Sequence, residues 1–158
     1  VTDMDADLSS DPKDILKAIK VYREKKPDLI IGSKYLAGSG VIKRKFLRML
    51  CSKIYTISCK LLISNKISDY SAGYRFYSTK SLKKLITRKQ RYLSPSQHLE
   101  NLLFYYENKL KISEFPVFYK DTDENSKSIP LIHIIVFIFQ LSNILINYYF
   151  RKFKKFFI

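Results

Sequence analysis

The sequence predicts an α/β fold, because short apolar segments alternate with amphipathic segments along the 158-residue chain. Residues 1–4 and 29–33 are apolar runs of the kind that parallel sheets bury. The segment between them, and a second one at 41–63, repeat their apolar residues at helical spacing. A hydrophobic content of 46% is enough for a sizeable core and argues against a disordered chain.

The first strand leads into two carboxylates, Asp5 and Asp7. Because successive strand residues alternate between faces, the two side chains are expected on the same side, roughly 6–7 Å apart. That spacing lets them share one divalent cation, although solvated acidic turns have the same pattern. In an open α/β sheet ligands bind beyond the carboxyl ends of the strands, which is where both residues fall.

The next elements are a helix and a second strand. Asp11 is the expected N-cap and Pro12 the first helical residue. The strand at 29–33 follows, and a loop at 38–40 can bring backbone amides near an anion. The expected inner face of the helix comprises Ile15, Ala18, Ile19 and Tyr22.

A long amphipathic helix is predicted over 41–63, with Phe46, Leu50, Ile54, Ile57 and Leu61 on one stripe. Its other face is basic, and residues 41–66 include no acid at all. The whole chain carries 29 Lys and Arg against 14 Asp and Glu. Such a field attracts polyanions, so this face is either solvated or contacts phosphate or a membrane. The basic residues are Lys43, Arg44, Lys45, Arg48, Lys53, Lys60 and Lys66.

The rest of the α/β part follows the same alternation. A loop from Asp69 enters a strand that ends near Tyr77. Ser94 is the expected N-cap of a helix, with Gln97 completing a capping box. A strand is predicted over 111–118, and Pro116 places it at a sheet edge or at its own end.

Five motifs in this order resemble the dolichyl-phosphate mannosyltransferase-like members of glycosyltransferase family 2. They are Met-Asp-Ala-Asp-Leu, Gly-Ser-Lys-Tyr with its Gly-x-Gly loop, Asp-Tyr-Ser-Ala-Gly-Tyr-Arg, Ser-Pro-Ser-x-x-x-Glu, and Glu-Phe-Pro-Val followed by Ser-Lys. Each motif is weak alone, but five in order are specific. The resemblance covers residues 1 to about 128.

The resemblance implies a Rossmann-like nucleotide-sugar fold and an inverting transferase that moves a sugar from a nucleoside diphosphate to a polyprenyl phosphate. It implies that Asp5, Asp7 and Ser9 hold Mg²⁺ or Mn²⁺ against the donor diphosphate. Asp7 and Arg75 are then the candidate catalytic residues. The matching basic positions, Lys34, Arg48 and Lys127, are the candidate phosphate-binding residues.

The chain departs from the family pattern at several places. Ser9 stands where the family often has Gln, and Lys34 where Arg is usual. Before Ser126 and Lys127, the family has an Arg and a Gly, whereas this loop is acidic. Family members also have several strands ahead of the aspartate motif, which carry base and ribose contacts. We therefore expect this chain to be the C-terminal part of a longer protein or a truncated reading frame, without turnover by itself.

The C-terminal segment has a membrane signal of its own. Residues 129–150 contain no charge and would form a helix of about 33 Å, close to the thickness of a hydrocarbon core. His133, Gln140, Asn143 and Asn147 nevertheless form a polar stripe on it. An interfacial or hairpin helix, a single span and a soluble packing helix all remain open. The basic residues 151–155 would lie at cytoplasmic headgroups if the segment spans.

These observations predict two parts: residues 1–128, a transferase catalytic region, and residues 129–158, a membrane-associating helix with a basic tail. The expected partners are a nucleoside diphosphate sugar, a polyprenyl phosphate and the cytoplasmic face of a membrane. The alternative is a non-catalytic basic remnant that binds anionic membrane or nucleic acid. Nucleic acid is disfavoured, because no aromatic-interleaved binding pattern accompanies the positive charge.

Overall fold

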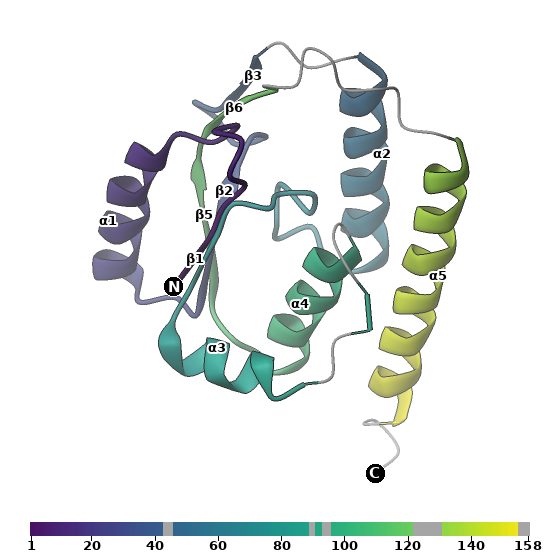
Figure 1. Cartoon of the computed structure of the whole chain (residues 1–158). Coiled ribbons are helices and arrows are strands. Elements are labelled where there is room, and N and C mark those ends of the chain that lie inside the picture. The colour runs from purple at the N-terminus through teal and green to yellow at the C-terminus, as the bar shows by residue number, and fades with distance from the viewer. Residues whose placement is uncertain (43–45, 89–90, 93–95, 122–130, 155–158) are drawn as a thin grey trace.

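The computed structural model describes residues 1–42, 46–88, 91–92, 96–121 and 131–154 and has a mixed α/β architecture (Figure 1). The strands are β1 (Thr2–Asp3), β2 (Leu29–Ser33), β3 (Gly40–Ile42), β4 (Arg75–Tyr77), β5 (Ile112–Pro116) and β6 (Phe118–Lys120). A short 3₁₀ turn (Pro12–Asp14) leads into α1 (Ile15–Lys25). The other helices are α2 (Phe46–Leu62), α3 (Thr79–Ile86), α4 (Ser96–Glu107) and α5 (Leu131–Lys154).

The main sheet has four strands in the order β1-β4-β2-β5. β2 runs parallel to β5 and antiparallel to β4, whereas β1 pairs antiparallel with β4. The expectation of a parallel sheet therefore holds for the pair β2 and β5 and is wrong for β1, whose two residues are exposed. A second sheet consists of β3 and β6, paired in parallel.

Both faces of β2 are buried, which explains its unbroken apolar run. Ile30 points to the α1 side, where it packs with Ala18 and Phe115. Leu29 and Ile31 point to the opposite face and join a larger core that includes side chains of α2, α3, α4 and α5. Figure 1 accordingly shows α1 on one side of the sheet and α2 and α4 on the other.

The start of the first helix is confirmed, because Asp11 accepts a hydrogen bond from the backbone N–H of Lys13 and Pro12 begins the turn. Its predicted inner face is only partly right. Ala18 is buried as expected, but Ile19 and Tyr22 are exposed. The buried face is displaced toward Val21, which packs beside Ala18 against the sheet in place of Ile19 and Tyr22.

The predicted start of the second helix is wrong, whereas the predicted position of Pro116 is confirmed. The helix predicted from residue 41 begins at Phe46, because residues 40–42 form β3 against β6. Pro116 is the last residue of β5, and β5 is an edge strand of the main sheet, as its proline predicted. The predicted cap Ser94 and the boundary at residue 128 lie outside the described residues.

The C-terminal helix α5 packs beside α4, and its Ile144 and Tyr148 belong to the larger core. Among the described residues, no helix combines the length and the apolar character needed to cross a membrane.

We predict that Gly32→Ala destabilises the fold by about 1–3 kcal/mol through overpacking. A Cβ at this position of β2 would lie 2.9 Å from Val117 Cγ1 and 3.0 Å from Tyr74 Cδ1. Urea unfolding measures the change. Gly73→Ala is the matched control, because the nearest atom to its new Cβ is 3.5 Å away. Equal unfolding midpoints for the two variants would contradict the close packing of β2.

Candidate functional site

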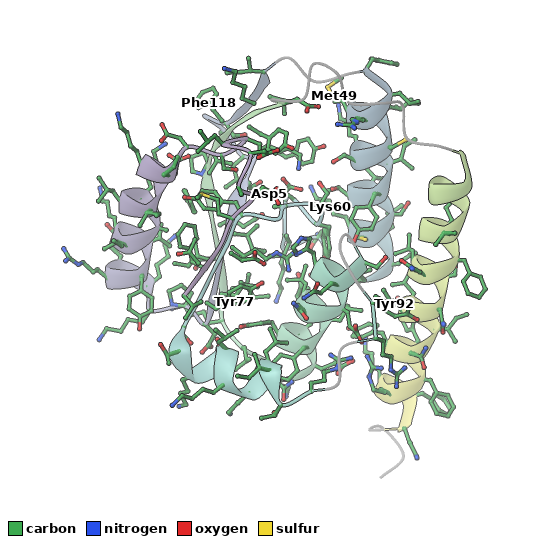
Figure 2. The ribbon with its side chains drawn as sticks, in the orientation of Figure 1. Asp5, Met49, Lys60, Tyr77, Tyr92 and Phe118 are labelled. Carbon is green, nitrogen blue, oxygen red and sulfur yellow. The ribbon has the colours of Figure 1, made fainter. Side chains whose placement is uncertain are left out.

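A polar pocket lies at the carboxyl ends of β2 and β5, where the sheet changes from parallel to antiparallel pairing. This is the edge at which open α/β sheets bind ligands. Asp5, labelled near the centre of Figure 2, contributes a carboxylate from the turn after β1. The lining residues are Asp5, Ser10, Gly32, Lys34, Asp69, Ser71, Ala72, Gly73, Tyr74, Val117 and Tyr119.

The aspartate pair lies beyond β1, which ends at Asp3, and Asp7 is part of a turn. The alternation of strand faces, from which we expected both carboxylates on the same side, therefore does not reach Asp7. Leu8 adopts φ 60°, a left-handed conformation that bends the chain, and Asp7 Oδ1 accepts a hydrogen bond from Ser9 N at 2.9 Å. Of the two carboxylates, Asp5 alone lines the pocket.

The two aspartates are nevertheless close enough to interact electrostatically. Partial burial raises the pKa of Asp5 above its usual value, and the nearby carboxylates of Asp7 and then Asp3 raise this pKa further. A cation between Asp5 and Asp7 would relieve this repulsion. The described residues contain no group of three or more His, Cys, Asp or Glu side chains suited to a metal ion, so a site of Asp5, Asp7 and Ser9 stays a prediction.

Ser9 is buried, and its Oγ has no hydrogen-bond partner within the described part of the chain. The Ser9 carbonyl accepts from Lys120 N at 2.8 Å, and Ser10 forms an isolated bridge with Tyr119. The turn is thus fixed at both ends. β1, which precedes it, pairs with β4, and Ser9 and Ser10 at its end contact β6.

Lys34 forms a buried ion pair with Asp69 at the pocket wall. Its Nζ lies 2.9 Å from Asp69 Oδ2 and 2.8 Å from Ser71 Oγ, and the exposed fractions are 8% for Lys34 and 0% for Asp69. The hydroxyl chain continues from Ser71 to Ser52 on α2 at 2.7 Å and from there to Tyr35 at 2.9 Å. The candidate phosphate ligand Lys34 therefore reaches the pocket with its charge already balanced by Asp69.

Glu114 on β5 fixes the loop that carries Asp69, a role that the sequence did not indicate. Its carboxylate accepts hydrogen bonds from Ser68 N and Oγ, both at 2.8 Å, and from Asp69 N at 3.2 Å. Burial raises the pKa of Glu114, and the bonds from Ser68 and Asp69 oppose that rise.

Arg75, a candidate catalytic residue, is fully buried in β4 and does not line the pocket. It donates from Nε to the Ala72 carbonyl at 2.9 Å and from Nη1 to the His98 carbonyl at 2.6 Å. In this arrangement Arg75 stabilises the pocket without lining it, because it joins the loop before β4 to α4.

The two other candidate phosphate ligands are Arg48 and Lys127, and neither is found at the pocket among the described residues. Arg48 on α2 does not line the pocket, and its Nη1 lies 3.5 Å from Asp121 Oδ2. Asp121, an acid of the loop that departs from the family pattern, thus pairs with Arg48, one of the predicted basic site residues. Lys127 lies outside the described residues.

His98 on α4 is a further residue beside the site, and no sequence pattern indicated this position. A Cβ placed on Gly73 would lie 3.5 Å from His98 Nε2 and 3.6 Å from Asp5 Oδ2, so the imidazole and the carboxylate both lie next to this glycine. Burial lowers the pKa of His98 to about 4, with Arg75 contributing. The imidazole is therefore neutral at pH 7.

Comparison with known proteins gives a partial match. No protein-family model matches the chain. Over 85 residues, or 54% of the chain, the sequence is 32% identical to a polyprenol monophosphomannose synthase of Mycolicibacterium smegmatis. The aligned part is 32% of that protein, so the chain spans about a third of the relative it matches. The match is to a glycosyltransferase that its name connects with polyprenol, in line with the resemblance drawn from the motifs.

We predict that Lys34→Met destabilises the fold by about 3–5 kcal/mol, because it leaves Asp69 charged and buried without its partner. Asp69→Asn is also expected to be costly. The double variant should lose much less stability than the sum of the two single changes. Urea unfolding of all four proteins measures the coupling, and additive losses would show that the pair contributes nothing specific.

We predict that neutral His98 makes the fold sensitive to acid. The pKa is lowered from 6.5 to about 4 on folding, so the stabilisation is complete above pH 6.5 and is lost as the pH falls toward 4. Between pH 7 and pH 5 the loss is up to about 2 kcal/mol. Chemical unfolding at both pH values should show a smaller loss for His98→Gln. An unchanged loss would assign the acid sensitivity to other groups.

Proposed function

We propose that this chain is part of a polyprenyl-phosphate glycosyltransferase, which transfers a sugar from a nucleoside diphosphate sugar to a lipid-borne phosphate. One observation carries the proposal: the Asp5 turn and the Asp69–Gly73 loop, two motifs far apart in the sequence, line the same pocket. That pocket occupies the ligand-binding edge of the sheet. The match to the mycobacterial synthase supports the same class of reaction.

The oxygen-rich turn fits a hard divalent cation. Asp5 and Asp7 supply two carboxylates that repel each other, and buried Ser9 supplies an Oγ without a described partner. Mg²⁺ and Mn²⁺ favour such oxygen ligands. When bound, the cation supplies neutralisation of charge on the donor diphosphate.

The side chains of the chain itself then position the reactants. Lys34, held by Asp69 and Ser71, presents a positively charged group at the pocket wall without the freedom of a surface lysine. Neutral His98 lies next to Gly73, as Asp5 does, and adds no charge. Because an acceptor phosphate is already anionic, the reaction needs orientation and charge neutralisation more than a strong general base.

The proposed acceptor is carried by a lipid, so the reaction belongs at a membrane surface. The cytoplasmic face is the proposed side, because its leaflet carries the anionic lipids that attract a basic segment such as residues 151–155.

We predict that the chain binds Mn²⁺ through Asp5 and Asp7. Asp5→Asn and Asp7→Asn should each weaken binding by at least about tenfold, because each removes an anionic ligand while preserving the shape of the side chain. Loss of the electron paramagnetic resonance signal of free Mn²⁺ on titration measures the affinity.

Asp3→Asn is the matched control, because it removes the same charge from a residue of β1 that also raises the pKa of Asp5. Its Mn²⁺ affinity should stay near that of the unaltered chain. Equal losses of Mn²⁺ affinity in all three variants would mean that net charge alone explains the effect, and they would contradict a metal-ligand role for Asp5 and Asp7. A chelator-insensitive sugar transfer by the full-length protein would do the same.

A further inference from the structure

The apolar stripe of α2 faces outward. The residues expected on one stripe, among them Phe46, Ile57 and Leu61, are exposed by 72%, 51% and 82%. The buried face of this helix consists of Ser52, Tyr55, Thr56 and Cys59. The helix therefore buries Tyr55 and Cys59 in the core beside two hydroxyl side chains, and it leaves most of its large aliphatic and aromatic side chains outside, where a surface helix ordinarily carries polar groups.

The helix α5 also exposes an apolar face. On its inner side, beside the core residues Ile144 and Tyr148, Gln140 Oε1 accepts from Ser96 Oγ at 2.6 Å and Arg151 Nη2 lies 2.6 Å from Glu107 Oε1. The opposite side of the helix is apolar and exposed. It comprises Phe139, Ile146, Tyr149, Phe150 and Phe153.

The two exposed faces adjoin each other. Tyr149 of α5 donates a hydrogen bond to the Leu62 carbonyl of α2, and Figure 1 shows both helices on the side of the molecule away from α1. A monomeric soluble protein seldom exposes so many neighbouring large apolar side chains. We call these two outward faces together the α2–α5 surface.

The charged side chains within the two helices, as far as the structure describes them, are all positive. Lys53 and Lys60 follow the edge of the α2 stripe, and Lys152 and Lys154 lie at the end of α5. Neither helix contains an Asp or a Glu. A second copy of this chain would bring equal positive charge against the same surface, whereas an anionic bilayer would match both the charge and the apolar groups.

We infer that the α2–α5 surface docks on an anionic lipid bilayer, with the apolar side chains in the interfacial region and the lysines at the headgroups. Long lysine side chains can reach headgroup phosphates while their stems lie along apolar surface. Each helix lies on the bilayer along one face. The inference goes beyond the proposed reaction, because it requires neither the sugar donor nor the polyprenyl phosphate.

The test uses the absence of tryptophan from the sequence. A single Trp introduced on an exposed position reports on its own surroundings alone. Ile57→Trp is the reporter on α2, and Phe150→Trp is the reporter on α5. Leu16→Trp is the matched control, since Leu16 is an exposed apolar residue of α1, across the sheet. Each protein is mixed with phosphatidylcholine vesicles, with and without phosphatidylglycerol.

Both the α2 and the α5 reporters should shift their emission to shorter wavelength on phosphatidylglycerol vesicles and should be quenched by brominated acyl chains. The control should change in neither respect. Adding Lys53→Gln and Lys60→Gln to the α2 reporter should weaken vesicle binding by about fivefold per lysine. High salt should weaken it as well, because it screens the charges and leaves apolar burial in place.

Several results would overturn the inference. A shift of the α5 reporter alone would remove α2 from the docking surface. Emission that shifts with protein concentration before vesicles are added would assign the surface to a second copy of the chain. An equal response of the α1 control, or no response at all, would exclude specific docking. Because these vesicles contain no polyprenyl phosphate, none of these results depends on the proposed transferase activity.

Discussion

The buried ion pair between Lys34 and Asp69 is the constraint on which the pocket depends. Lys34 directly follows β2, and Asp69 belongs to the segment between α2 and β4, so the pair joins the sheet to that segment. Two charges removed from water remain stable only if their other hydrogen-bonding positions are filled. Ser71 donates to Asp69 from both N and Oγ, and Glu114 holds the backbone of the same segment. The pocket wall is therefore positioned by the fold before any ligand binds, which favours electrostatic catalysis.

The features predicted correctly from the sequence depend on neighbouring residues. The helix start at Asp11 and Pro12 needs only a capping side chain and a fixed φ, and the end of β5 at Pro116 needs only a missing N–H. The buried strand β2 follows from its continuous apolar run. The meeting of the Asp5 turn with the Asp69 segment was accessible only through the resemblance, because no spacing rule connects residues so far apart.

The features that sequence reasoning missed depend on tertiary contacts or on rare backbone geometry. Periodicity showed that α2 has an apolar stripe, but Tyr55 and Cys59 also make its opposite face apolar enough to bury. The turn after β1 requires a left-handed conformation at Leu8, which a non-glycine residue rarely adopts. Glu114 and Ser68 are 46 residues apart in the sequence, so no local pattern around either residue predicts their contact. The position of His98 next to Gly73 comes from the packing of α4, and a lone histidine in the sequence does not predict it.

The helix α2 connects the two surfaces to which we assign function. On its inner side Ser52 bonds to Ser71, which in turn bonds to Lys34 at the pocket wall. On its outer side the same helix presents the apolar stripe that we infer to contact lipid. A polyprenyl phosphate has the same division, with an apolar chain that stays in the bilayer and an anionic group that must leave it. A helix that is polar toward the pocket and apolar toward the bilayer would bring that phosphate to the pocket without drawing its chain from the membrane. On these two proposals, the exposed apolar stripe of α2 serves the reaction and is not a defect of the fold.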